Sequence, residues 1–366
     1  MAQALSQDVI FEVLSRLPVK SLIRFKATCK AWLALISEPY FIASHYKRSR
    51  ANPSLLILPL KQDIFQETVD LYSYKKEARV SELLLQRKLP CEDRLLALYP
   101  CQVNGIIMLF SERSFHICNP STKEFLTLSP PYSDHAHHCV GFGLDSSTNK
   151  YKVVRVFLRS FDENTQDYDL GCEIFTLGDG SWRTIDGPPC TIVRNCPATV
   201  GEVVYWPTYK KEHGMAILQF SLRDETFGVV PGPPLKANEN YVPSDLVALE
   251  GDLGYVDRRV ESYTVDIWAL NACNNTWSKK YNIDCSNFGL MTVEAADDRK
   301  ILLSSGNRLA YFDPRSKTWT AVLAIGGAPN DKYPWKQACM SFLDGSLHFF
   351  VAPFAESLVS VTTGSH

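Results

Sequence analysis

A repeated pattern of short apolar strands separated by tight turns constrains the fold of this chain more than any other feature. Residues 246–283 show the whole pattern: two apolar strands around a tight turn, a loop, a third strand, a short polar turn and a fourth strand that opens on an aromatic residue. Residues 299–323 repeat its last three strands. Strands of this kind at regular spacing indicate a β-sandwich or a closed all-β array. Residues 80–89 are the one stretch of the body whose apolar spacing also allows a helix.

The length of the repeat decides between these architectures. The first tight turn of each unit recurs every 43 to 54 residues, near Asn104, Ser147, Gly201, Gly251, Asp297 and Asp344. The aromatic residue that opens the last strand recurs at similar intervals, at Phe125, Trp182, Phe227, Trp277 and Trp319. A four-stranded unit of roughly 40–50 residues is the period of a β-propeller blade. Six first turns therefore predict six blades, with five or seven as the alternatives.

The unequal counts of first turns and outer aromatics predict how the ring closes. The sixth unit begins in residues 338–351, close to the C-terminus, and has no fourth strand of its own. Residues 53–60, near the N-terminus, read as a strand that can complete it. Pairing of the two ends removes open edge strands, which otherwise invite aggregation.

The N-terminal region has a different, helical pattern. Residues from Val9 to Leu17 place their apolar side chains on one helix face, and Pro18 ends this helix because it lacks an amide hydrogen. Apolar residues from Leu22 to Ile36 supply further helical turns, which end near Pro39. Three short helices in about 45 residues bury only part of this apolar surface among themselves. The rest faces either a partner protein or the body of the same chain, and the pattern alone leaves both open.

Charge separates this N-terminal region from the body. Residues 1–50 hold eight basic and three acidic residues, a net charge of +5, whereas the remainder holds 30 basic and 37 acidic residues, a net charge of −7. A basic head on an acidic body favours an acidic partner for the head. The net charge of the whole chain is −2, so nothing global points to nucleic acid or an anionic membrane.

The pattern of cysteines indicates the cellular compartment of the protein. The eleven cysteines form no CxxC pair and are scattered singly, which is typical of reduced thiols in an intracellular protein. The first apolar residues are interleaved with Asp8 and Glu12, unlike a signal peptide, and no apolar run approaches the roughly 20 residues of a membrane helix. We therefore expect a protein of the cytoplasm, the nucleus or both.

Residues 5–45 resemble the plant F-box motif. They carry its acidic start at Asp8, its Leu17-Pro18-Val19-Lys20 step and its Trp32, and depart from it at Ser6, where the family usually has proline. The resemblance implies that the helices bind a Skp-family adaptor, which hangs from a cullin scaffold carrying a RING subunit. The expected adaptor-binding residues are Leu5, Val9, Ile10, Val13, Leu14, Leu17, Pro18, Leu22, Phe25, Lys30, Trp32 and Leu33.

The body resembles the kelch-like, F-box-associated domains of plant F-box proteins. The stretches that carry the resemblance are residues 103–110, 117–128 and 140–156, above all Gly141-Phe142-Gly143-Leu144-Asp145 followed by Tyr151-Lys152-Val153-Val154. The paired glycines of a strict kelch repeat occur only at residues 326–327, so the repeat is of the degenerate type. The expected organisation is an all-α F-box of three short helices at 1–46, a linker at 47–53 and an all-β propeller of six kelch-like blades at 54–366.

Side chains suited to catalysis or metal binding are few. His135, His137, His138 and Cys139 have metal-ligand chemistry, but no second cluster completes a zinc site, and a polar loop is the favoured interpretation. We expect Asp145, Asp179, Asp252, Asp313 and Asp344 to stabilise turns rather than act as acids, and the repeat-phased tryptophans to pack between blades. The sequence has no GxSxG, Walker or dinucleotide motif. No enzyme activity and no cofactor are expected.

The resemblance implies a substrate-receptor subunit of a Skp–cullin–F-box ubiquitin ligase that holds a protein for ubiquitination. Two alternatives stay open: a propeller that binds a small molecule or glycan, and a pollen-incompatibility type receptor for a ribonuclease. Recognition by propellers lies in loops that vary on a fixed scaffold. The candidate substrate loops are the polar stretches Arg159 to Gly171 and Thr208 to Gly214, and nothing in them identifies the substrate.

Overall fold

The computed structural model describes most of the 366-residue chain. The described residues are 6–59, 68–75, 80–89, 101–111, 114–131, 138–162, 167–192, 197–235, 245–249, 251–289, 291–296, 300–305, 308–324 and 349–362. They form two compact units. The first comprises Met1–Ser129 together with Phe349–His366, and the second comprises Pro130–His348.

The first unit begins with four helices: α1 (Gln7–Leu14), α2 (Val19–Lys26), α3 (Lys30–Ser37) and α4 (Pro39–Ser49). The expectation of three helices is wrong because Pro39 ends α3 and also begins α4. Proline fits the first helical position, where its missing amide hydrogen is not needed. Helix α4 continues to Ser49 and so includes the first three residues of the expected linker 47–53.

Two antiparallel sheets complete the first unit. One has the strand order β24-β1-β2-β3, with β24 (Phe349–Phe354), β1 (Ser54–Pro59), β2 (Thr68–Lys75) and β3 (Val80–Lys88). The other runs in order through β4 (Cys101–Val103), β5 (Ile106–Phe110), β6 (Phe115–Asn119) and β7 (Glu124–Leu128). Apolar side chains of both sheets share one core cluster, which includes Leu56, Leu71, Ile107 and Leu109.

Strand β3 corrects the helical alternative for residues 80–89. The segment pairs with β2 over its whole length, from Lys75↔Val80 to Thr68↔Lys88. Leu85 is buried in the cluster shared by the two sheets. A strand satisfies the backbone groups of this segment and buries Leu85 at the same time, and this tertiary gain outweighs an ambiguous local pattern.

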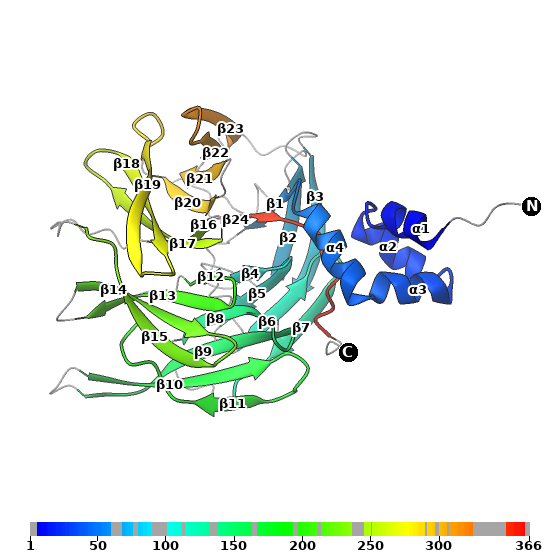
Figure 1. Ribbon diagram of the computed structural model, residues 1–366, viewed down its shortest axis with the longest axis horizontal. Helices are drawn as coiled ribbons and strands as arrows, with labels where there is room; N and C mark the ends of the chain where they lie inside the picture. Colours follow the sequence, from blue (N-terminus) through cyan, green and yellow to red (C-terminus); the bar gives the residue numbers. More distant parts are fainter. Residues whose placement is uncertain are drawn as a thin grey trace, which may run out of the picture. The chain divides into compact units, whose positions relative to one another are not determined.

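The pairing of β24 with β1 agrees with the expected contact between the two ends of the chain. The pairs run from Ser54↔Phe354 to Pro59↔Phe349, so the last strand lies beside the first one (Figure 1). Of the expected C-terminal segment 338–351, only residues 349–351 are described, and the turn near Asp344 lies outside the described residues.

The second unit contains sixteen described strands in three sheets. The first sheet has β8 (His138–Asp145), β9 (Lys150–Asp162), β10 (Asp167–Thr176) and β11 (Trp182–Ile185). The second has β12 (Ala198–Val200), β13 (Val203–Lys210), β14 (Gly214–Ser221) and β15 (Thr226–Pro231).

The third sheet is eight-stranded and consists of two antiparallel halves. One half has β16 (Asp245–Leu249), β17 (Asp252–Arg259), β18 (Thr264–Asn271) and β19 (Thr276–Asp284). The other has β20 (Thr292–Ala296), β21 (Ile301–Ser305), β22 (Arg308–Asp313) and β23 (Thr318–Ala324). A single parallel pair, Leu249↔Ala296, joins the halves. The first strands of successive groups are neighbours: β12 contacts both β8 and β16.

The outer aromatics predicted from the sequence lie in the fourth strand of each complete group. Trp182 is paired with Phe175, Phe227 with Phe220 and Trp319 with Phe312, at ring-centroid distances of 4.7 to 5.4 Å. Aromatic cross-strand pairs of this kind stabilise a sheet. The residue two positions before each fourth-strand aromatic has a positive φ: Lys123, Gly180, Glu225, Asn275 and Lys317. The connection between the third and fourth strands therefore has a positive φ at the same position in all five groups, although the one between β10 and β11 is a residue longer and also has a positive φ at Gly178.

Candidate functional site

The head, which we define as helices α1 to α4, divides the expected adaptor-binding residues by exposure. Val9, Val13 and Leu33 expose 44%, 53% and 46% of their surface, and Pro18 and Lys30 are exposed as well. The half-buried residues are Ile10, Leu17, Phe25 and Trp32. Leu5 lies outside the described residues.

Leu14 and Leu22 are buried in the core of the head itself, together with Val19, Ile36 and Phe41. Their periodicity is that of an apolar helix face, and the sequence does not show which part of that face the other helices cover. Substitution of Leu14 or Leu22 therefore tests the stability of the head rather than its surface.

Two exposed apolar residues of the head are missing from the expected set. Ile23 of α2 exposes 39% of its surface and Tyr40 of α4 exposes 73%. Ile23 directly follows the buried Leu22 in α2. Consecutive side chains of a helix point in different directions, so the helical period already indicates that Ile23 does not share the buried face of Leu22. The ring of Tyr40 stacks on Phe11 at 5.7 Å.

The head packs on the C-terminal segment of the same chain. Leu358 is buried in the core of the head, and the Val19 amide at the start of α2 donates to Glu356 Oε2 at 2.8 Å. Pro18, the N-cap of α2, has no side-chain cap, so Glu356 fills that role from 337 residues away. One face of the head thus packs on the C-terminal segment, while Val9, Val13 and Leu33 stay exposed.

Ion pairs orient the basic residues of the head. Glu12 accepts from Arg48 and Arg16, and these hydrogen bonds lower the pKa of the Glu12 carboxyl to about 2. The pairs join α1 to α4 and leave the other basic side chains of the head, such as Lys20 and Arg24, at its surface. The exposed part of the head is therefore both apolar and basic.

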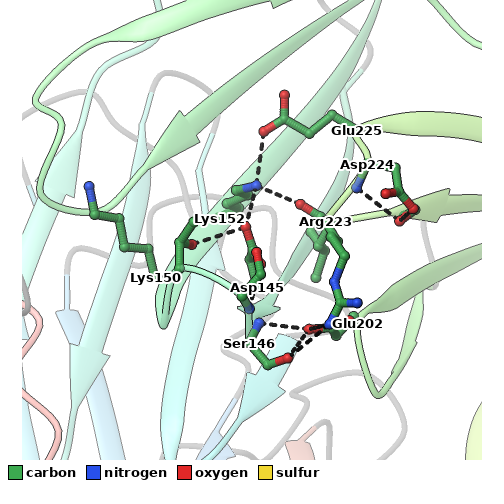
Figure 2. Close-up of polar contacts among 12 residues, drawn as sticks. Asp145, Ser146, Lys150, Lys152, Glu202, Arg223, Asp224 and Glu225 are labelled. Carbon is green, nitrogen blue, oxygen red and sulfur yellow. Dashed lines mark hydrogen bonds and ion pairs between the residues drawn. The ribbon is translucent and has the colours of Figure 1, made fainter.

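A polar cluster in the second unit occupies the turns that connect β8 to β9 and β14 to β15 (Figure 2). The Lys152 ammonium lies 2.8 Å from Asp145 Oδ2 and 2.9 Å from Glu225 Oε1, and it donates to the Leu222 carbonyl at 2.5 Å. Arg183 also pairs with Glu225. Lys152 and Asp145 are buried, with side-chain exposures of 6% and 2%.

A second part of this cluster lies at the β12–β13 turn. Glu202 accepts from the Ser146 amide at 2.8 Å and pairs with Arg223 at 3.0 Å (Figure 2). Burial opposes ionisation of Asp145, but hydrogen bonds from Lys152, Ser147 and Thr148 outweigh it and lower the pKa of its carboxyl. Three carboxylates and three cations balance across the two parts, so the cluster offers no excess charge to a ligand.

The glycines beside this cluster allow the two sheets to approach closely. A Cβ on Gly141 would lie 2.7 Å from Trp206 Cζ2, and one on Gly143 would lie 2.3 Å from Leu222 Cδ1. The indole of Trp206 donates to the Val140 carbonyl at 3.2 Å. The stretch from Gly141 to Lys152 that carries the family resemblance is therefore a joint between neighbouring sheets.

The turn aspartates behave as expected where the structure describes them. Asp145 accepts from the Ser147 amide, and Asp313 accepts from the Arg315 and Ser316 amides. Asp179 lies in a turn and pairs with Lys150, Asp252 directly follows a turn, and Asp344 lies outside the described residues.

The expected packing of the repeat-phased tryptophans between groups applies to Trp277 and Trp319. Trp277 donates to the Pro231 carbonyl of β15 at 2.8 Å, and Trp319 packs on the core shared by the halves of the eight-stranded sheet.

The histidine cluster is only partly described. His135 and His137 lie outside the described residues, and His138 and Cys139 begin β8. Within the ranges given above, no group of three His, Cys, Asp or Glu side chains is arranged to hold a metal ion.

The two candidate loops differ in what the structure shows of them. Residues 159–171 form the outer part of the β9–β10 hairpin, of which 163–166 lie outside the described residues. In the stretch 208–214, Thr208 is fully buried and donates to the Thr191 carbonyl. Residues 211–213 lie outside the described residues. Among the described helices, none combines the length and apolar content needed to cross a bilayer.

Comparison with known families and proteins assigns both parts of the chain. Residues 3–43 match the F-box domain, and residues 56–345 match the F-box associated beta propeller domain. F-box protein CPR1 of Arabidopsis thaliana is 28% identical over 354 residues, covering 86% of this chain and 83% of that protein. F-box/kelch-repeat protein At3g17530 of the same plant is 24% identical over 309 residues, covering 78% and 79%.

A third relative, F-box protein At5g10340 of Arabidopsis thaliana, is 25% identical over 363 residues, covering 87% of this chain and 80% of that protein. The domain matches account for the helical head and for the propeller-like body described above. The chain belongs to the F-box proteins that carry an F-box-associated β-propeller domain.

Proposed function

We propose that this protein is the substrate-receptor subunit of a Skp–cullin–F-box ubiquitin ligase. One observation carries the proposal: the head leaves Val9, Val13 and Leu33 exposed although its other face is packed on the C-terminal segment. Exposed apolar side chains on a basic, helical surface suit an adaptor that is apolar and acidic. The match of residues 3–43 to the F-box domain supports the same partner.

The body supplies the second half of the proposal. It holds a target protein so that a lysine of the target lies near the conjugating enzyme. The receptor accelerates ubiquitin transfer by raising the effective concentration of that lysine and supplies no catalytic group. The balanced, buried cluster around Lys152 supports a scaffolding role for those charged residues. The cullin scaffold and its RING subunit are reached through the adaptor, in the cytoplasm or the nucleus.

A closed ring of six blades with kelch-like repeats belongs to this proposal. Supporting it are the match to a β-propeller family, the six antiparallel groups of four strands among the described residues, and the pairing of β24 with β1. A ring presents the loops between strands on a common rim, where variation changes the target without changing the scaffold.

The adaptor contact is tested by placing a charge on the uncovered surface. Val13→Asp and Leu33→Asp should each weaken binding of a Skp-family adaptor by at least about tenfold, because an unpaired carboxylate is then buried in an apolar contact. Isothermal titration calorimetry with the purified full chain measures the affinity. Both side chains are about half exposed, so the thermal unfolding of the free protein should change little.

Val260→Asp is the matched control, because Val260 is an apolar residue of similar exposure, 43%, in the turn between β17 and β18. It should leave adaptor binding unchanged. Absence of adaptor binding by the natural chain, or full binding by both head variants, would contradict the proposed function.

A further inference from the structure

The head is a small unit with little packing of its own. Its four helices have 8, 8, 8 and 11 residues, and isolated helices shorter than about 12–15 residues are marginal in water. Contacts between side chains must therefore hold these helices in place. A unit of this size buries only a limited share of its apolar surface, so a contact supplied from outside the head has a large effect on its order.

The C-terminal segment after β24, residues 355–361, supplies such contacts. Leu358 exposes only 4% of its surface and is one of the six buried residues in the core cluster of the head. The Glu356 carboxylate accepts from the Val19 amide at 2.8 Å, where α2 begins without a side-chain cap of its own. Val19 is itself fully buried in the same cluster. The segment therefore holds the beginning of α2 by a hydrogen bond and completes the core beneath it.

The β4–β7 sheet holds the C-terminal segment in turn. The Ser357 amide donates to Ser121 Oγ at 3.1 Å. Glu124 accepts from the Ser360 hydroxyl at 3.1 Å and from the Val361 amide at 2.8 Å. Strand β24, which precedes the segment, pairs with β1, which follows the head in the chain. The position of the segment beside the head thus depends on contact between the two ends of the chain.

Two further points of the head meet the same contact region. Burial lowers the pKa of the Lys26 ammonium at the end of α2, and the charge of Glu124 opposes that shift. A Cβ on Gly105, in the β4–β5 turn, would lie 2.7 Å from the Ala355 carbonyl oxygen and 3.5 Å from Tyr46 Cε2 of α4. Glu124 and Gly105 therefore each lie near both the C-terminal segment and a helix of the head.

The exposed apolar surface of the head is carried by helices that share the core completed by Leu358. Val9 and Val13 belong to α1, and Leu33 belongs to α3. Each of these helices also contributes a buried side chain to the cluster that contains Leu358. A head that loses this support is ordered for a smaller fraction of the time, and its apparent affinity for a partner falls in proportion to that fraction.

We propose that Glu356 and Leu358 are positioning residues for adaptor binding: they hold the head in the arrangement that the adaptor binds, although they act through α2 and the core. Adaptor binding then depends on contact between the two ends of the chain. A receptor whose C-terminal strand and segment are not yet in place is a poor ligand of the adaptor, which keeps incomplete chains out of the ligase. The inference rests on the proposed function, because that function supplies the adaptor as the partner.

Calorimetric titration of the full chain with a purified Skp-family adaptor tests the proposal. Glu356→Ala/Leu358→Ala should bind at least about tenfold more weakly than the natural chain, because the adaptor must then order the head. Glu356→Gln/Leu358→Met keeps an acceptor oxygen and a similar side-chain volume, and it should regain most of the affinity. Val361→Ala is the matched control. Val361 is also 4% exposed and lies in the same segment, but it is not among the residues of the core cluster of the head.

Hydrogen exchange of the natural chain provides a second measurement that needs no variant. Coupling between two binding events is reciprocal, so a segment that promotes adaptor binding must itself be held more tightly when the adaptor is bound. Exchange of the Ser357 and Val361 amides, which donate to Ser121 and Glu124, should slow about fivefold or more on addition of the adaptor. A segment that only stabilised the sheets would show no such response.

Three outcomes would overturn the inference: full adaptor affinity of Glu356→Ala/Leu358→Ala, an equal loss of affinity in Val361→Ala, or unchanged exchange of the two amides on adaptor binding. If the double variant does not fold, the exchange measurement decides. Each of these outcomes leaves the natural chain bound to the adaptor and so spares the proposed function. Absence of binding by the natural chain would instead overturn the proposed function and this inference with it.

Discussion

At the scale of single residues, the buried charges of the second unit show how ion pairs and hydrogen bonds stabilise a charged group between packed β-sheets. Lys152 is surrounded by Asp145, Glu225 and the Leu222 carbonyl, so its ammonium is paired on several sides. Burial lowers the pKa of the Lys152 ammonium, but these contacts outweigh it and raise that pKa overall. A buried charge without partners is far more costly than a buried pair.

Replacement of Lys152 by methionine should therefore destabilise the body by about 3–5 kcal/mol at neutral pH, because the buried Asp145 carboxylate loses its cation, whereas Glu225 keeps Arg183. Denaturant unfolding measures this loss. The pKa of Asp145 is lowered in the folded protein from an ordinary value of 3.8, so its contribution to stability is complete above that pH and is lost progressively as the pH falls from there through the lower pKa of the folded state. The difference between variant and natural chain should accordingly shrink as the pH falls below about 4.

Lys150→Met is the control for this experiment. Lys150 pairs with Asp179, but its side chain is 34% exposed and that of Asp179 49% exposed, so its removal should cost less than about 1 kcal/mol. Equal losses of unfolding free energy for Lys152→Met and Lys150→Met would mean that the buried pairs of Lys152 stabilise the body no more than an exposed pair does.

At the scale of elements, the C-terminal segment after β24 connects the head to the sheets. Residues 356 and 358 contact the head, whereas the neighbouring backbone is held by the β6–β7 turn. Asn119 donates to the Ser357 and Val359 carbonyls at 2.9 and 2.7 Å, and the Val361 amide donates to Glu124. Residues 356 and 358 of this segment thus contact the head, and residues 357, 359 and 361 contact the β6–β7 region. The segment therefore links the head to the β4–β7 sheet.

Glu356→Ala should release the amide end of α2, because the Val19 amide loses the carboxylate oxygen that accepts from it and Pro18 has no side-chain acceptor. We expect a loss of about 1 kcal/mol in the stability of the head. Faster hydrogen exchange of the α2 amides reports it directly. Glu356→Gln retains an acceptor oxygen and should keep most of the protection. Unchanged exchange in Glu356→Ala would show that the cap is dispensable.

At the scale of the whole molecule, strands from opposite ends of the chain share one sheet. Six register pairs between β1 and β24 give β1 a partner on the side away from β2. Without β24, the backbone of β1 would present an open edge, and such edges template association with other chains.

A chain that ends at residue 348 should therefore form oligomers or aggregates, as measured by size-exclusion chromatography with light scattering. A chain that ends at Thr362 keeps β24 and the contacts of Glu356 and Leu358, and it should behave like the natural protein. A monomeric product with an unchanged melting temperature from the shorter chain would contradict a structural role for the pairing.

The sequence by itself determined the elements whose signals are local. The turn that precedes each outer aromatic depends on a few adjacent residues, such as Asp313 and Lys317 before Trp319, and it was readable from spacing. The helices of the head have local signals of the same kind, although Pro39 indicates the end of α3 and does not by itself show that α4 begins there. Only the tertiary structure decided which members of an apolar face are buried: Leu14 is in the core and Val13 is exposed, although they are adjacent. It alone showed that Glu356 caps α2 and that Lys152 is enclosed by Asp145 and Glu225. Local turn and helix preferences act over a few residues, whereas burial and charge pairing depend on contacts between segments far apart in the chain, which no local pattern encodes.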